Sequence, residues 1–174
     1  MKKSVIAFDI GGTNMRCALV RKNKIVDYVQ VPTPKTKDNF IKKMEEFIKK
    51  FDSPKVHGIG IGIAGSVNKG KLINAPNLPV KHFDFKKHFQ KKFRKTVEVA
   101  NDASCFALAE LELGSKLDNF ILITIGTGIG GGIIANGKIY HGSGYGVELG
   151  HIIVRKKAWN PLCPKQKKPR KLKL

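Results

Sequence analysis

The stretch FDIGGTN, residues 8–14, places an acid and two adjacent glycines where the first apolar run of the chain must turn. Two interpretations are open. The glycines can serve only a tight turn that needs positive φ angles. They can also let backbone N–H groups approach an anion, to which the Thr13 hydroxyl donates, while Asp9 holds the water molecules of Mg²⁺. The stretch therefore predicts either a simple turn or a phosphate loop.

A second glycine-rich stretch, GTGIGGG at 126–132, follows another apolar run. Alone, it fits a tight turn as well as a phosphate loop. Two such hairpins facing each other could clamp a polyphosphate, with Asp9 on the metal side. The two stretches together favour phosphate binding.

Literal matches to the dinucleotide-binding pattern GxGxxG occur at 60–65 and 126–131. That pattern binds pyrophosphate because its loop opens a helix with free amide groups. Here the following residues, SVNKGKLINA and GGGIIANGKI, are typical of strands and turns. We therefore expect no Rossmann-type site, and the sequence contains no GxxxxGK[ST] P-loop.

Hydrophobic periodicity predicts an α/β fold. Three strands come before the first helix, so the sheet should have an antiparallel edge and a parallel remainder. Helices are expected at 36–51, 83–93 and 101–114, and Asn136-Gly137 is a hairpin turn. Strands are expected at 4–9, 15–20, 24–31, 55–65, 96–100, 119–126 (a buried strand), 133–136 and 137–142.

The composition predicts a globular protein of the cytosol with no membrane partner. Its 174 residues, 41% of them hydrophobic, suffice for one domain, or for one domain plus part of another. No apolar run is long enough to span a membrane, and an acid and two glycines interrupt the N-terminal run before a signal-peptide core forms. Three cysteines without CxxC spacing fit reduced thiols, so no disulfide is expected.

The formal net charge of +20 makes nucleic-acid binding a hypothesis worth weighing. Residues 155–174 carry nine Lys or Arg and no acid. The whole chain has only five arginines, whereas bidentate recognition of phosphates and base edges favours Arg over Lys. A solvated lysine-rich surface is the favoured interpretation, and nucleic acid is a disfavoured partner.

Asn101 and Asp102 stand between an expected strand and an expected helix. Both residue types cap helix N-termini well, and a carboxylate there is favoured by the helix dipole. A carboxylate at the carboxyl end of a strand in an open α/β sheet also points into the usual ligand crevice, where it could accept a proton from a substrate hydroxyl. Two roles therefore remain open for these residues: helix capping alone, or helix capping together with catalysis.

Glu148 and His151 are three residues apart and would share one face of a helical turn. They could hold vicinal sugar hydroxyls or a metal ion. This spacing alone is a weak signal, and ordinary surface polarity explains it better.

Six segments, taken together, resemble the ROK family (repressor, open reading frame, kinase) of sugar kinases. They occur in the family's order over about 150 residues, which is specific. They are FDIGGTNMR at 8–16, GIGIAGSV at 60–67, NAPNLP at 74–79, NDAS at 101–104, GTGIGGGII at 126–134 and GVELGH at 146–151.

The resemblance implies an actin-like ATPase, ribonuclease-H-like fold with a mixed sheet: an N-terminal lobe plus the start of a second lobe. It also implies phosphorylation of a hexose, often glucose, on its terminal hydroxyl, with ATP and Mg²⁺. Asp102 would be the general base, and the sugar would be held by Asn77, Asn101, Asp102, Glu148 and His151. The phosphate loops would be Asp9, Ile10, Gly11, Gly12, Thr13 and Asn14, and Gly126, Thr127, Gly128, Ile129, Gly130, Gly131, Gly132 and Ile133.

The chain departs from the family after His151. ROK proteins carry a cysteine motif there whose thiols bind zinc together with that histidine. This chain has Cys163 alone, so His151 and Cys163 supply two ligands where a structural zinc needs four, and zinc is in doubt. ROK proteins are also longer and usually homo-oligomeric, so we expect a truncated or frameshifted product without the usual dimer surface.

The expected organisation is a ribonuclease-H-like lobe at 1–115 with the first phosphate loop and the catalytic Asp, an incomplete second lobe at 116–154, and a basic, disordered tail at 155–174. The favoured function is a sugar kinase of glucokinase type, with an activity that truncation can abolish. The alternatives are a remnant that binds sugar or phosphate without turnover, and a nucleic-acid-binding module that uses the tail.

Overall fold

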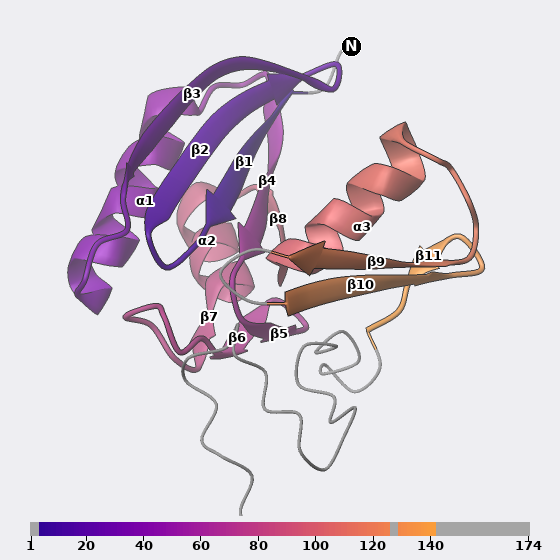
Figure 1. Cartoon of the computed structure of the whole chain (residues 1–174). Coiled ribbons are helices and arrows are strands. Elements are labelled where there is room, and N and C mark those ends of the chain that lie inside the picture. The colour runs from indigo at the N-terminus through magenta and orange to yellow at the C-terminus, as the bar shows by residue number, and fades with distance from the viewer. Residues whose placement is uncertain (1–3, 126–128, 142–174) are drawn as a thin grey trace, which may run out of the picture. The chain divides into compact units, whose positions relative to one another are not determined.

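The computed structural model of the protein describes residues 4–125 and 129–141 (Figure 1). The chain forms two compact units, Met1–Cys105 and Phe106–Leu174. The boundary between them falls inside helix α3, Asp102–Leu113. The predicted site residues from Asp9 to Asp102 therefore all belong to the first unit.

A five-stranded mixed sheet forms the centre of the first unit, in the order β3-β2-β1-β4-β8. The neighbours β1, β2 and β3 are antiparallel, whereas β1, β4 and β8 are parallel. This confirms the predicted antiparallel edge and parallel remainder. The strands are β1 (Ser4–Ile10), β2 (Asn14–Arg21), β3 (Lys24–Pro32), β4 (Val56–Ile63) and β8 (Thr96–Asn101).

A small antiparallel sheet follows β4 and contains β5 (Ser66–Asn68), β6 (Lys71–Asn74) and β7 (Phe83–Asp84). The glycine pattern at 60–65 thus runs through strand β4 into another strand and opens no helix. The prediction that this pattern continues into strands and turns is confirmed, so it lacks the helix N-terminus on which pyrophosphate binding by this pattern depends.

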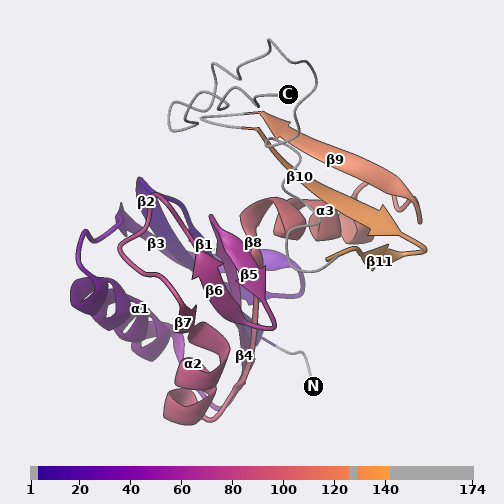
Figure 2. The same cartoon turned by 90° about the horizontal axis from the view of Figure 1, so that it is seen from below.

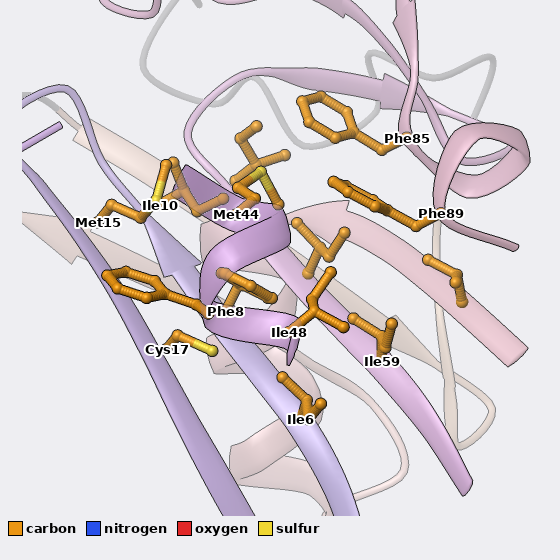
Figure 3. Close-up of a cluster of buried hydrophobic side chains, with 14 of the residues drawn as sticks. Ile6, Phe8, Ile10, Met15, Cys17, Met44, Ile48, Ile59, Phe85 and Phe89 are labelled. Carbon is orange, nitrogen blue, oxygen red and sulfur yellow. The ribbon is translucent and has the colours of Figure 1, made fainter. Parts of the chain in front are cut away.

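Helices α1 (Lys37–Phe51) and α2 (Phe85–Phe93) cover one face of the five-stranded sheet (Figure 2). Helix α1 begins where predicted, because the Thr36 side chain accepts a hydrogen bond from the Asn39 N–H and caps the first turn. Its apolar stripe enters the main core, where Figure 3 shows Met44 and Ile48 among side chains of the strands. The lysines of both helices are exposed or only partly buried.

Strand β1 alternates between the two faces of the sheet, as a strand must. Ile6, Phe8 and Ile10 are buried in the core beneath the helices (Figure 3). Asp9 is exposed and therefore projects from the opposite face. The same alternation that builds the core thus presents the first acid of FDIGGTN on the other side of the sheet.

In the second unit, β9 (Phe120–Ile125), β10 (Ile129–Ala135) and β11 (Lys138–Ile139) form an antiparallel sheet in the order β11-β10-β9. Residues Asn136 and Gly137 both have positive φ angles, 52° and 67°, and join β10 to β11. This confirms the predicted Asn-Gly hairpin turn.

The prediction of a buried strand at 119–126 is wrong. Ile121, Ile123 and Ile125 are 61%, 60% and 76% exposed. The continuous apolar run is typical of a strand covered on both faces, yet in the described part of the chain only alternate residues of β9 are partly buried.

The second glycine loop is also shorter than predicted. Residues from Ile129 onward pair with β9, beginning with Ile129 opposite Ile125, so Gly130, Gly131 and Gly132 lie in strand β10. The glycines are tolerated there because a two-stranded ladder needs only their backbone groups. Only residues 126–128 connect β9 to β10, and they lie outside the described residues.

Within residues 4–125 and 129–141, no helix combines the length and the apolar character needed to cross a membrane.

The buried thiol of Cys17 predicts a loss of stability in alkali. Burial raises the pKa of Cys17 from 9.0 to about 12, although the Lys50 charge opposes the shift. Below about pH 9 the thiol is protonated in both the folded and the unfolded protein. Above about pH 9 the thiol ionises only in the unfolded protein, which favours unfolding. Between pH 8 and pH 10, we expect wild type to lose about 1.4 kcal/mol of unfolding free energy relative to Cys17→Ala. Urea unfolding at both pH values measures this, and equal pH dependence of the two proteins would contradict it.

Candidate functional site

The turn between β1 and β2 is closed by a hydrogen bond from the Gly11 N–H to the Asn14 carbonyl, at 2.9 Å. Neither Gly11 nor Gly12 has a positive φ angle. The interpretation that a positive φ requires these glycines is therefore wrong. Either close packing of a neighbouring residue or access of a ligand to the backbone must explain why they are glycines.

Three consecutive carbonyl groups of this turn are held by the segment that follows β3. The Thr33 hydroxyl donates to the Gly11 carbonyl at 2.6 Å, and the Thr33 N–H donates to the Thr13 carbonyl at 2.8 Å. The Lys35 ammonium donates to the Gly12 carbonyl at 3.4 Å. Thr33 is 2% exposed, so this tether is shielded from water.

The tether sets the direction of the amides. In a trans peptide the C=O and N–H groups point in opposite directions. Because the Gly11 and Gly12 carbonyls point toward Thr33 and Lys35, the N–H groups of Gly12 and Thr13 point away from them. Among the described residues none accepts a hydrogen bond from these two amides. Two adjacent N–H groups of this kind are suited to donate to an anion.

Gly12 lies directly against Asn77, which the sequence places 65 positions later. A Cβ atom on Gly12 would lie 2.8 Å from the Asn77 Cβ and 3.3 Å from its carbonyl oxygen. Any side chain at position 12 would therefore push the two loops apart. The fold brings the predicted sugar-binding Asn77 beside the predicted phosphate loop.

Asn101 connects β8, α3 and the loop after β4. Its Oδ1 accepts the Ser104 N–H at 3.2 Å and caps helix α3, while its Nδ2 donates to the Gly65 carbonyl at 3.1 Å. The expected cap is thus Asn101 rather than Asp102. Asp102 begins the helix itself, with its Oδ1 accepting the Ala103 N–H at 2.9 Å.

Strand register places Asp102 at the same edge of the sheet as the turn. Ile10 pairs with Ile63, and Ile63 pairs with Asn101, so three parallel strands end in one row. Strand β8 lies two strands from β1, or about 10 Å away. The span between the turn amides and Asp102 is therefore that of a small substrate.

Cys105 lies against Gly62, close enough to Asp9 and Asp102 to feel the charge of both. Its Sγ would lie 3.2 Å from a Cβ on Gly62, the β4 residue paired with Asp9. Burial raises the pKa of the Cys105 thiol to about 11, and the negative charges of Asp102 and Asp9 raise it further. The thiol is therefore a neutral packing group, and Gly62 provides the room for it.

Arg16 is a site residue that sequence reasoning missed. Its Nη1 lies 2.8 Å from Oδ2 of Asp9, and its Nε donates to Oε1 of Gln30 at 2.8 Å. The sequence could have predicted this pair, because a tight hairpin turn that pairs Ile10 with Met15 also pairs Asp9 with Arg16 on the two antiparallel strands. Lys35 was missed for another reason: its contact with Gly12 depends on where β3 ends.

Asp9 fits a role in Mg²⁺ binding. Among the described residues, no group of three or more His, Cys, Asp or Glu could hold a metal ion. Mg²⁺ needs no such group, because it keeps several waters and binds one or two carboxylates together with substrate phosphates. Asp9 is exposed and stands one residue before the turn. Since Arg16 already pairs with it, a cation must share this carboxylate with the guanidinium group.

The remaining predicted residues lie in strands β1 and β10 or outside the described residues. Ile10 is fully buried and its carbonyl accepts the Ala64 N–H at 2.9 Å, so it supports the turn from within the core. Ile129 to Ile133 lie in β10. Outside the described residues lie Gly126, Thr127, Gly128, Glu148 and His151, together with Cys163.

Comparison with known proteins shows the family to which the chain belongs. The sequence pattern of the ROK family matches residues 5–167. The chain belongs to the ROK family. The solved ROK structures share its architecture, which confirms the actin-like, ribonuclease-H-like fold that the resemblance implied.

Its curated relatives include several sugar kinases. The chain is 34% identical to a glucokinase of Halalkalibacterium halodurans over 86% of its own length and 49% of the relative's. It is 32% identical to an N-acetylmannosamine kinase of Vibrio cholerae over 91% of its length and 56% of the relative's. A ROK family glucokinase from Streptomyces griseus, solved with glucose and AMPPNP, superposes with a TM-score of 0.77 at 33% identity, covering 87% of this chain and 51% of that one. The chain thus spans about half the length of the relatives it matches.

The contact between Gly12 and Asn77 predicts different effects for two adjacent glycines. Gly12→Ala should lower the free energy of unfolding by about 1–3 kcal/mol, because its Cβ meets Asn77 and the loops must separate. Gly11→Ala is the matched control: its Cβ would lie 3.8 Å from the Asn14 carbonyl oxygen, an ordinary contact, so about 0.5 kcal/mol or less is expected. Urea unfolding measures both changes.

A third protein tests the cause. Gly12→Ala combined with Asn77→Gly removes the opposing Cβ, so the double variant should lose less than the sum of the two single variants. Equal losses in Gly11→Ala and Gly12→Ala, or simple additivity in the double variant, would contradict the contact.

Proposed function

We propose that this chain carries the phosphate loop and the general base of a sugar kinase, which transfers the γ-phosphoryl group of ATP to the terminal hydroxyl of a hexose. The observation that carries the proposal is the pairing of two features at one sheet edge. The amides of Gly12 and Thr13 point away from their tether, and Asp102 follows the strand two positions across the sheet.

The turn amides suit the phosphates of ATP. Two adjacent N–H groups that point the same way favour an oxyanion, and the Thr13 hydroxyl, which is exposed, adds a third donor. The ammonium group of Lys35 lies on the far side of the Gly12 peptide and adds positive charge to this region. Mg²⁺, when bound, neutralises phosphate charge, and Asp9 would hold it through water.

Asp102 suits the role of general base. A carboxylate at the end of a parallel strand can accept the proton of a sugar hydroxyl as that oxygen attacks the γ-phosphorus. Its backbone is held by helix α3 and by the Asn101 cap, which is itself anchored to the Gly65 carbonyl. The base is therefore fixed to the sheet rather than carried on a mobile loop, which favours a constant distance to the hydroxyl.

Asn77 and Asn101 would hold the sugar, together with Glu148 and His151. Support for the first two comes from their positions at the sheet edge beside Gly12 and Asp102. Glucose is the first substrate to test, because several relatives are glucokinases and the Streptomyces griseus enzyme was solved with glucose. N-acetylmannosamine is the second, because relatives named for that sugar match equally broadly.

A second candidate function is binding of sugar or nucleotide without turnover. The observation in its favour is the coverage, since half of each relative has no counterpart in these 174 residues.

Replacement of Asp102 tests the base. In a coupled assay with ATP, Mg²⁺ and a panel of hexoses, Asp102→Asn should lower kcat about 10²–10⁴-fold, because the amide keeps the Ala103 contact but cannot take a proton. Glu98→Gln is the matched control: it makes the same chemical change on strand β8, where Glu98 is exposed and pairs with Lys86.

The outcomes separate the two functions. Turnover in wild type that survives Asp102→Asn would refute the assignment of Asp102 as the general base. Hexose binding by calorimetry without ATP turnover in wild type would favour the binding function over the kinase.

A further inference from the structure

The tether that holds the β1–β2 turn is the segment PTPK, residues 32–35. It is itself fixed at both ends. Pro32 ends β3 opposite Asn14, and Thr36, the first residue after the tether, caps helix α1. Thr33 precedes a proline, which favours an extended backbone at that position. The tether is therefore a stiff piece of chain that joins the turn to helix α1.

The turn that it holds is permissive. The peptide group between Gly11 and Gly12 has a glycine on each side. Glycine populates positive and negative φ angles with similar ease, so these residues resist a rotation of the peptide group very little. Such a rotation would point the Gly12 N–H at the tether and the Gly11 carbonyl at the opposite side. A carbonyl oxygen repels a phosphate, so only one of the two orientations suits an anion.

The donors of the tether distinguish between these two orientations. The Thr33 hydroxyl donates to the Gly11 carbonyl at 2.6 Å, and because Thr33 is 2% exposed, rotation would leave a buried O–H without this acceptor. The next carbonyls are held by groups that cannot accept a hydrogen bond: the Lys35 ammonium for Gly12 and the Thr33 N–H for Thr13. All three contacts favour the orientation with its carbonyls toward the tether.

We propose that Thr33 and Lys35 are positioning residues that keep the turn in its phosphate-binding orientation. The inference rests on the proposed function, because it requires phosphate as the ligand of the turn. Neither residue lies on the ligand side: both act through the carbonyls of Gly11 and Gly12 on the amides that follow. A variant that populates the binding orientation for about one tenth of the time binds nucleotide about tenfold more weakly.

A role in folding alone is the competing explanation for a buried threonine. That role and the proposal make different predictions for nucleotide affinity. If Thr33 only stabilises the fold, loss of its hydroxyl lowers stability and leaves the dissociation constant of the folded protein unchanged. If Thr33 positions the turn, the dissociation constant rises in protein that is fully folded.

Calorimetry of the full 174-residue chain with Mg²⁺ and a non-hydrolysable ATP analogue tests the proposal. Salt of about 0.3 M suppresses non-specific attraction of the nucleotide to lysines. Thr33→Val keeps the side-chain shape without the hydroxyl, so Kd should rise about tenfold or more. Thr33→Ser keeps the hydroxyl, so its Kd should stay within about threefold of wild type.

The matched control is Thr36→Val. It removes the same hydroxyl from a threonine whose side chain accepts the Asn39 N–H and caps α1. Its Kd should stay within about twofold of wild type, because the cap makes no contact with the turn. Urea unfolding of each variant shows which ones are folded under the conditions of the titration.

A second pair of variants decides the matter if Thr33→Val does not fold. Lys35 is exposed, so Lys35→Met removes the donor to the Gly12 carbonyl without disturbing the core. Lys37→Met removes the same charge two positions later, where the ammonium lies 5.5 Å from the centre of the Phe83 ring. Lys35→Met should raise Kd at least about threefold more than Lys37→Met.

The outcomes separate this inference from the function on which it rests. A wild-type chain that binds no nucleotide would overturn both. Nucleotide binding that Thr33→Val leaves unchanged, or that Thr33→Val and Thr36→Val weaken equally, would overturn the inference and leave the proposed function standing. If Thr33→Val does not fold, equal effects of Lys35→Met and Lys37→Met would do the same.

Discussion

The trans geometry of two peptide bonds is the constraint on which the candidate site depends. Thr33 and Lys35 hold the carbonyls of Gly11 and Gly12. Because N–H and C=O point in opposite directions in a trans peptide, the N–H groups of Gly12 and Thr13 must point away from Thr33 and Lys35. No special backbone conformation is needed, and none is present. A loop with ordinary φ angles thus directs two amide donors to one side, because a neighbouring segment occupies its carbonyl acceptors.

The sheet supplies the second half of the arrangement. Parallel pairing of β1, β4 and β8 ends three strands in one row, and helix α3 begins directly after the last of them. Alternation along β1 buries Phe8 and Ile10 and turns Asp9 to the other face. The packing that stabilises the first unit therefore also positions its acids. A substitution that shifted this register would move both acids away from the turn.

Much of this was predictable from the sequence because it is local. The apolar stripe of α1 and the Asn136-Gly137 turn each depend on residues a few positions apart, and each was found where predicted. Two features depend on distant residues. The contact of Gly12 with Asn77 and the tether from Thr33 require a loop path that periodicity does not encode. The burial of β9 was mispredicted because its composition suits a strand covered on both faces, whereas Ile121, Ile123 and Ile125 are exposed.

The central claim is that the amides of the β1–β2 turn and the start of α3 form one ligand-binding edge. Amide chemical shifts of the ¹⁵N-labelled chain, titrated with Mg²⁺ and a non-hydrolysable ATP analogue, test it most directly. The account predicts that the largest shifts fall on Gly12 and Thr13, with further changes at Asp102 and Ala103 when a hexose is added. Shifts confined to the basic residues 155–174 that vanish in high salt would contradict it, because they would show non-specific attraction of an anion to a lysine-rich segment.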